Sequence, residues 1–96
     1  GDVYKRQVSL VSEPYYDCTG ESVIIVKNID FSKIRLNSTR NDRITIKALT
    51  RVLLLPDFGK IDEIYDDMEL ENGASVELVF AVGNWYILSS DGLKQS

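Results

Sequence analysis

Apolar and polar positions along this chain form short runs that are separated by polar turns. Residues 33–36 and 43–49 alternate with period two, and residues 22–27 form a continuous run rich in β-branched side chains. Both patterns are typical of β-strands. The sequence therefore predicts an all-β protein with strands near 8–11, 22–27, 33–36, 43–49, 52–55, 68–70, 75–80 and 84–88.

The segment 61–70 is ambiguous, because four of its apolar residues recur at the i, i+3, i+4 and i+7 spacing of a helix. It lacks a clear N-cap, so we expect a loop that leads into a short strand at 68–70. Residues 81–83 are expected to form the turn of the clearest hairpin, because Gly83 tolerates the backbone angles of tight turns. The polar residues from Ser89 onward are expected to fray.

Many short strands with turn residues between them indicate a β-sandwich, roll or prism. We expect a small sandwich-like or prism-like domain of short antiparallel strands. Residues 22–36 and 43–55 each hold two strand patterns around a short turn, which indicates an internal repeat. A β domain of 96 residues buries a modest core, and domains of this size often gain stability by assembling.

The start of the chain reads differently from the rest. Residues 2–7 resemble the translation of a transposase adapter used in DNA library preparation, and Gly1 resembles a cloning remnant. We therefore assign residues 1–7 to a cloning or adapter-derived segment and residues 8–96 to one all-β domain. The natural N-terminus is expected to be missing, as in a metagenomic sequence.

The composition argues against catalysis. The chain has no histidine, which removes the commonest general base and neutral metal ligand, and its one cysteine excludes an internal disulfide. Cys18 is most simply a small buried or turn residue. The longest apolar run, residues 52–55, is far shorter than a membrane span requires. We expect no enzyme activity, no cofactor, no metal and no membrane insertion.

The C-terminal half resembles a known family. Residues 73–80 read Gly-Ala-Ser-Val-Glu-Leu-Val-Phe, and residues 83–88 read Gly-Asn-Trp-Tyr-Ile-Leu. This resembles a segment near the C-terminus of phage tail fibre and tail spike proteins. In that segment, a Gly-x-Ser-Val-x-Leu-Val strand leads through a short turn into Asn-Trp-Tyr. The chain departs from the family pattern at the turn, where Ala81 and Val82 replace the usual Asp-Gly.

Upstream segments resemble the same family in the same order. Residues 22–36 resemble the opening strand pair, residues 43–47 the Thr-Ile-Lys-Asn strand, and residues 59–62 the Gly-x-Ile-Asp-Gly stretch. Ala48 and Glu63 depart from those motifs, at positions where the family usually has asparagine and glycine. The resemblance covers roughly residues 15–90.

The resemblance implies a non-enzymatic virion module that is part of a trimeric tail fibre or spike and is made in the bacterial host cytoplasm. Its implied partners are further copies of itself, as a homotrimer, and a host surface glycan for receptor binding. Two other hypotheses stay open. One is a free-standing bacterial carbohydrate-binding β-sandwich. The other, much weaker, is a small hydrolase that uses a pair of carboxylates.

Aromatic pairs are the first candidate contact residues. Trp85 and Tyr86 are adjacent on a predicted strand, so they should point to opposite faces, one into the core and the other outward or into an interface. Sugar stacking is the alternative role for this pair. Tyr15 and Tyr16 follow Pro14, and they either anchor an edge segment or form an exposed glycan patch.

Charge is divided along the chain. Residues 57–71 are rich in carboxylates, which form either a solvated acidic loop or a calcium site, although the spacing matches no EF-hand. Residues 33–51 are rich in lysine and arginine, but no aromatic residue interleaves with them as a nucleic-acid surface would require. We therefore expect no nucleic acid partner. Instead, Arg43 and Arg51 are predicted to contact acidic patches on neighbouring subunits.

Overall fold

The computed structural model describes residues 7–92, and these residues form strands without any helix. The strands fall where the apolar runs predict them, with one addition at Tyr15–Asp17 that the sequence pattern did not reveal. The segment before Met68 is a loop, as expected. The strands are β1 (Val8–Val11), β2 (Tyr15–Asp17), β3 (Val23–Val26), β4 (Phe31–Arg35), β5 (Arg43–Ala48), β6 (Arg51–Leu55), β7 (Met68–Leu70), β8 (Ser75–Ala81) and β9 (Asn84–Asp91).

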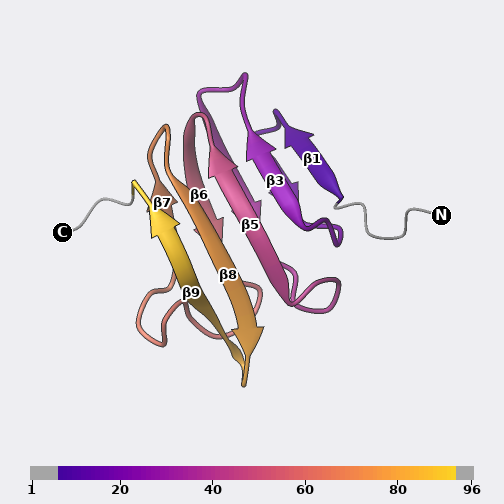
Figure 1. Cartoon of the computed structure of the whole chain (residues 1–96), viewed down its shortest axis with the longest axis vertical. Coiled ribbons are helices and arrows are strands. Elements are labelled where there is room, and N and C mark those ends of the chain that lie inside the picture. The colour runs from indigo at the N-terminus through magenta and orange to yellow at the C-terminus, as the bar shows by residue number, and fades with distance from the viewer. Residues whose placement is uncertain (1–6, 93–96) are drawn as a thin grey trace.

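Two mixed sheets make up the domain (Figure 1). The five-stranded sheet has the order β1-β3-β5-β8-β9, and the four-stranded sheet has the order β2-β4-β6-β7. From β1 to β6 the chain passes to the other sheet after every strand. The pairs β1 with β2, β3 with β4, and β5 with β6 therefore form successive layers of a stack. The adapter-like residues 1–6 lie outside the described part of the chain, whereas the carbonyl of Gln7 accepts hydrogen bonds from the amides of Ser22 and Val23.

The prediction of antiparallel strands is wrong for the pairings among the first six strands, which are all parallel. The reason is the alternation between sheets: neighbours within one sheet are separated by a strand in the other sheet, which returns the chain to the same end. The predicted internal repeat is confirmed by this register. Val23 pairs with Thr45 and Phe31 with Arg51, so residues 22–36 stack strand for strand on residues 43–55.

Antiparallel pairing begins with the strands that follow the last parallel layer: β7 pairs with β6, β8 with β5, and β9 with β8. The turn between β8 and β9 consists of Val82 and Gly83, both with positive φ. The expected fraying from Ser89 is wrong at least as far as Asp91, which pairs with Ser75. A bulge near Leu78 shifts the register of β9 by one residue, so pairing continues beyond it.

Inward side chains from both sheets form one hydrophobic core. Period-two alternation selects them: Ile44, Ile46 and Ala48 of β5 are buried, whereas the residues between them are at least partly accessible. The largest fully buried side chain is Trp85 of β9. Burial of this apolar surface supplies the main stabilisation, at about 25 cal/mol for each Å² removed from water.

The strand directions place short loops at one end of the domain and the longer loops at the other end, together with the β8–β9 turn. Loops after β1, β3 and β5 gather at one end of the domain with the loop after β7, and these are short. Loops after β2, β4 and β6 gather at the opposite end with the β8–β9 turn, at the bottom of Figure 1. We call this second end the long-loop end, and it consists of residues 18–22, 36–42, 56–67 and 82–83.

Candidate functional site

Loops at the long-loop end contact one another in series. The side-chain amide of Asn41 donates a 2.8 Å hydrogen bond to the carbonyl of Glu21. Ser38 donates two hydrogen bonds, from its amide and its hydroxyl, to the same carboxylate oxygen of Asp57, each at 2.8 Å. Gly59 lies so close to the β8–β9 turn that an added Cβ would come within 2.0 Å of the Gly83 carbonyl oxygen. The four loops therefore form one continuous surface.

Asp57 is the central acceptor of this surface. Its second carboxylate oxygen accepts a 2.9 Å hydrogen bond from the indole Nε1 of Trp85. Burial acts to raise the pKa of Asp57, but the hydrogen bonds from Trp85 and Ser38 outweigh it and hold the pKa below its usual range. Asp57 is therefore ionised at neutral pH, and its donors are all supplied by the chain itself.

A second carboxylate is buried where the chain passes from β2 to β3. Glu21 is 2% exposed and accepts hydrogen bonds from the Tyr16 hydroxyl and from the amide of Thr19. Burial acts to raise the pKa of Glu21, but these hydrogen bonds hold it below the ordinary value. Burial, followed by the charge of Glu21, raises the pKa of the neighbouring Cys18 thiol to about 12. The thiol is therefore neutral and weakly nucleophilic.

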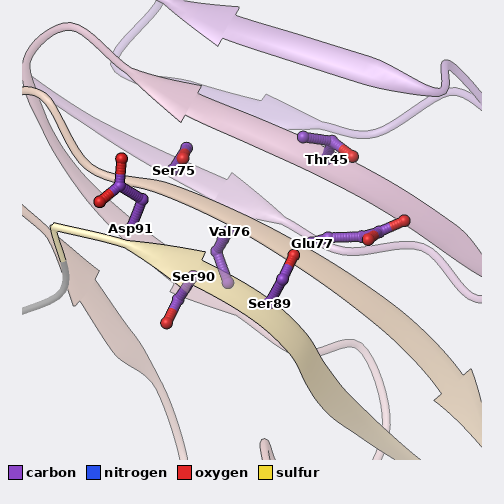
Figure 2. A pocket seen from close by; sticks show the side chains of 7 residues that line it. All are labelled: Thr45, Ser75, Val76, Glu77, Ser89, Ser90 and Asp91. Carbon is purple, nitrogen blue, oxygen red and sulfur yellow. The ribbon is translucent and has the colours of Figure 1, made fainter.

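A polar groove of 390 Å³ lies on the outer face of the five-stranded sheet, over β5, β8 and β9 (Figure 2). Figure 2 shows the Ser75 and Asp91 side chains side by side near one end of the groove, with Glu77 and Ser89 farther along it. The groove is open to solvent and holds hydroxyls and carboxylates but no aromatic ring. Its residues are Thr45, Ser75, Val76, Glu77, Ser89, Ser90 and Asp91.

The two aromatic residues Trp85 and Tyr86 point to opposite faces of β9, as strand geometry requires. Trp85 is 1% exposed and packs in the core against Phe80, with ring centroids 5.3 Å apart. Tyr86 points outward, and its hydroxyl donates a 2.8 Å hydrogen bond to Glu63, which raises the pKa of the phenol. Because Trp85 is buried, it offers no platform for sugar stacking.

Tyr15 and Tyr16 of β2 also point to opposite faces of their strand. Tyr15 is half exposed on the outer face of the four-stranded sheet, whereas Tyr16 turns toward the core and donates to Glu21. Burial, with the Glu21 hydrogen bond, raises the pKa of the Tyr16 phenol. Tyr16 therefore anchors the edge strand, which was one of the two roles expected for the pair.

Both candidate arginines have acidic partners within the chain. Arg43 Nε lies 3.0 Å from Glu77, across the β5–β8 pairing. Arg51 Nε lies 2.7 Å from Glu69, and its guanidinium stacks 4.8 Å from the ring centre of Phe31. Glu69 belongs to the carboxylate-rich segment 57–71, whereas Glu77 lies outside it, so of these two ion pairs only that of Arg51 joins the basic segment to the acidic one. Contacts of Arg43 and Arg51 with neighbouring subunits stay a prediction.

The acidic loop does not gather its carboxylates into one centre. Asp66 pairs with Lys60, Asp62 accepts a 3.0 Å hydrogen bond from the amide of Ile87, and Glu63 accepts from Tyr86. In the range 7–92, no group of three or more acidic or cysteine side chains is placed to hold a metal ion. The carboxylates of this loop therefore contact separate partners, two of which, Tyr86 and Ile87, lie on β9.

Sequence reasoning missed the two best-connected polar residues, Glu21 and Asp57, and the serine-lined groove. A turn sequence does not indicate that Glu21 is buried, nor that Asp57, among the carboxylates of 57–71, accepts from Trp85. The groove residues are brought together only by the pairing of β5, β8 and β9. No model of a known protein family matches the chain, and no curated protein matches it. No helix among the described residues is long and apolar enough to cross a membrane.

Proposed function

We propose that the chain is a non-enzymatic structural module of a phage virion, part of a tail fibre or spike that assembles as a homotrimer and takes part in attachment to the host surface. The observation that carries this proposal is the stack of parallel layers followed by the antiparallel strands β7–β9. Stacked repeats contact only their neighbours along one axis and require a terminal cap, which suits them to elongated assemblies.

The family resemblance points to the same region. Residues 73–88, whose motif resembles tail fibre and tail spike proteins, form the β8–β9 hairpin next to the last parallel layer. The hairpin brings Trp85 into the core and attaches the long-loop end through Asp57. The segment with the strongest resemblance is thus the part of the domain that would end a stack.

The surroundings of two carboxylates, the buried Glu21 and the partly buried Asp57, favour a structural role. Glu21 and Asp57 are held ionised by hydrogen bonds from donors within the chain, so neither is poised to release a proton as a general acid. Tyr16, Ser38 and Trp85 would have to be displaced before a substrate could reach these oxygens. Both carboxylates instead hold loops together.

The test is the solution mass of the full chain, measured by light scattering after size exclusion. The expected result is a stable particle with three times the mass of the chain across a wide range of concentration. A folded monomer at every concentration would overturn the trimer.

The polar groove favours a second candidate, a free-standing carbohydrate-binding module. Hydroxyls and carboxylates are the groups that hydrogen-bond to sugars, and Asp91 and Glu77 lie along the same groove. The absence of an aromatic ring from the groove ranks this candidate second. A glycan array probed with the wild-type protein and the Asp91→Asn variant tests it, since groove binding requires a wild-type signal that the variant loses.

A further inference from the structure

The turn between β7 and β8 contains the one Asn-Gly pair of the chain. Asn72 and Gly73 occupy the two central positions of this turn, which the amide of Ala74 closes with a 3.0 Å hydrogen bond to the carbonyl of Glu71. Gly73 has a φ of 98°, a backbone conformation that favours glycine at this turn position. Asn72 is exposed, and no hydrogen bond within the described part of the chain involves its side chain. Its carboxamide is therefore in contact with water.

An asparagine that precedes glycine is chemically labile. The backbone nitrogen of the glycine, once solvent has taken its proton, attacks the side-chain carbonyl carbon Cγ of the asparagine; a succinimide ring forms and ammonia leaves. Water then opens the ring at either carbonyl and yields aspartate or isoaspartate, so one water is consumed, one ammonia is released and nothing is oxidised or reduced. Glycine permits this attack because it has no Cβ beside the nitrogen. The other four asparagines precede residues that carry a side chain, at positions 29, 38, 42 and 85.

Hydrogen bonds from the end of β5 hold the nitrogen that would make this attack. The amide of Gly73 donates a 2.7 Å hydrogen bond to the carbonyl of Ala48, and the amide of Ala48 donates in return, at 2.8 Å, to the carbonyl of Ala74. Lys47 Nζ adds a 2.9 Å hydrogen bond to the Gly73 carbonyl. We call these three hydrogen bonds the turn clamp. Because the clamp engages the Gly73 proton and fixes its peptide group, attack on Asn72 requires the clamp to open.

We propose that Asn72 is a site of spontaneous deamidation, and that the turn clamp protects it in the folded domain until the turn opens. The turn leads directly into the β5–β8 pairing, so its geometry sets the start of that ladder. Isoaspartate lengthens the backbone by one carbon, which displaces Gly73 from Ala48, and both products add a negative charge next to Glu71. A modified turn therefore closes less well, and a transient opening leaves a permanent local destabilisation.

The experiment follows Asn72 by peptide mapping with mass spectrometry, which resolves asparagine, aspartate and isoaspartate. The full chain is incubated at mildly alkaline pH, either folded or unfolded in guanidinium chloride. In the unfolded chain, Asn72 is expected to react fastest of the five asparagines. In the folded chain, its reaction should be slowed by at least the protection factor that hydrogen exchange gives for the Gly73 amide, because both processes require the same hydrogen bond to open.

A matched pair of variants tests the turn clamp itself. Lys47→Met keeps the apolar stem of the side chain and removes the donor to Gly73, whereas Lys33→Met makes the same change at an exposed position of β4, in the other sheet. Loss of one such hydrogen bond shifts an opening equilibrium by about two- to tenfold. Folded Lys47→Met should therefore deamidate faster by that factor, and unfolded Lys47→Met at the wild-type rate. Lys33→Met should match wild type in both states.

Equal rates of reaction at Asn72 in the folded and the unfolded chain would overturn the proposal, because the turn clamp would then give no protection. Persistence of Asn72 in the unfolded chain would show that the Asn-Gly pair is not labile. If folded Lys33→Met reacts as fast as folded Lys47→Met, general destabilisation sets the rate and the clamp assignment fails. An unchanged rate in folded Lys47→Met would refute the part of the clamp assigned to Lys47.

Discussion

The indole nitrogen of Trp85 and the carboxylate of Asp57 lie 2.9 Å apart and join the start of β9 to the loop after β6. Trp85 is 1% exposed, so in the folded domain its N–H depends on this acceptor. The same carboxylate also holds Ser38 in the loop after β4. One acidic side chain thus connects three segments that are distant in the sequence.

Replacement of Asp57 by alanine is expected to lower the free energy of unfolding by about 1–3 kcal/mol, because it leaves a buried donor without a partner. Urea denaturation followed by the fluorescence of the single tryptophan measures this loss. The control is Asp66→Ala, which removes an exposed ion pair with Lys60 and should cost about 0–1 kcal/mol. Equal losses in both variants would contradict the role assigned to Asp57.

Acid should destabilise the domain through Glu21 and Asp57. Despite burial, hydrogen bonds hold both pKa values below their ordinary values of 4.5 and 3.8, so the folded state binds these protons more weakly than the unfolded state. Their stabilisation is complete above the unfolded values and is lost as pH falls through the folded ones. The free energy of unfolding should stay level from neutral pH to about pH 5 and decline below it.

Glu21→Gln provides the specific check on this acid sensitivity, because glutamine keeps the shape of the side chain and cannot titrate. Denaturant titrations at a series of acidic pH values should show a shallower decline for the variant. A decline as steep as that of the wild type would show that Glu21 does not contribute to it.

Replacement of Val82 by a residue that tolerates positive φ is expected to stabilise the domain. It is a β-branched residue with φ of 50° in the turn between β8 and β9, and it is 94% exposed. The left-handed conformation costs an ordinary residue about 1–2 kcal/mol, whereas asparagine tolerates it. Val82→Asn is therefore expected to raise the free energy of unfolding by about 1 kcal/mol. Val82→Thr, which stays β-branched, should bring no gain, and a similar gain from both variants would refute the explanation.

Cys18 should be protected from thiol reagents in the folded state. Burial is the main reason that its pKa is raised to about 12. Near pH 8, its thiolate fraction is then about a thousandfold below that of a free cysteine with pKa about 8.5. A colour-forming disulfide reagent should label the native protein at least that much more slowly than protein unfolded in guanidinium chloride. Rapid labelling of native protein would show that the segment before β3 opens readily.

The strand positions were predictable because period-two alternation is written in the local sequence. Residues 43–49 alternate so regularly that the pattern alone identifies the buried face of β5. The repeat of residues 22–36 in 43–55 was visible for the same reason. β2 was missed because Tyr15–Asp17 is short and carries no apolar alternation of its own.

Strand direction could not be predicted, because alternation has the same period in parallel and antiparallel sheets. The parallel pairing of Val23 with Thr45 depends on the intervening strand β4 lying in the other sheet, which is a property of the whole domain. The same limit applies to β9: adjacency indicated that Trp85 and Tyr86 face opposite sides, but not which of them enters the core.

The sequence by itself determined an all-β chain, its strands, its repeat and its most regular buried positions, because these follow from local periodicity and residue preference. The tertiary structure alone decided the parallel stacking, the burial of Glu21 and the joining of Asp57 to Trp85. It also decided that Val8 and Leu10 of β1 would face outward. Each of these depends on which distant segments become neighbours, and that is set by the packing of the two sheets around one core.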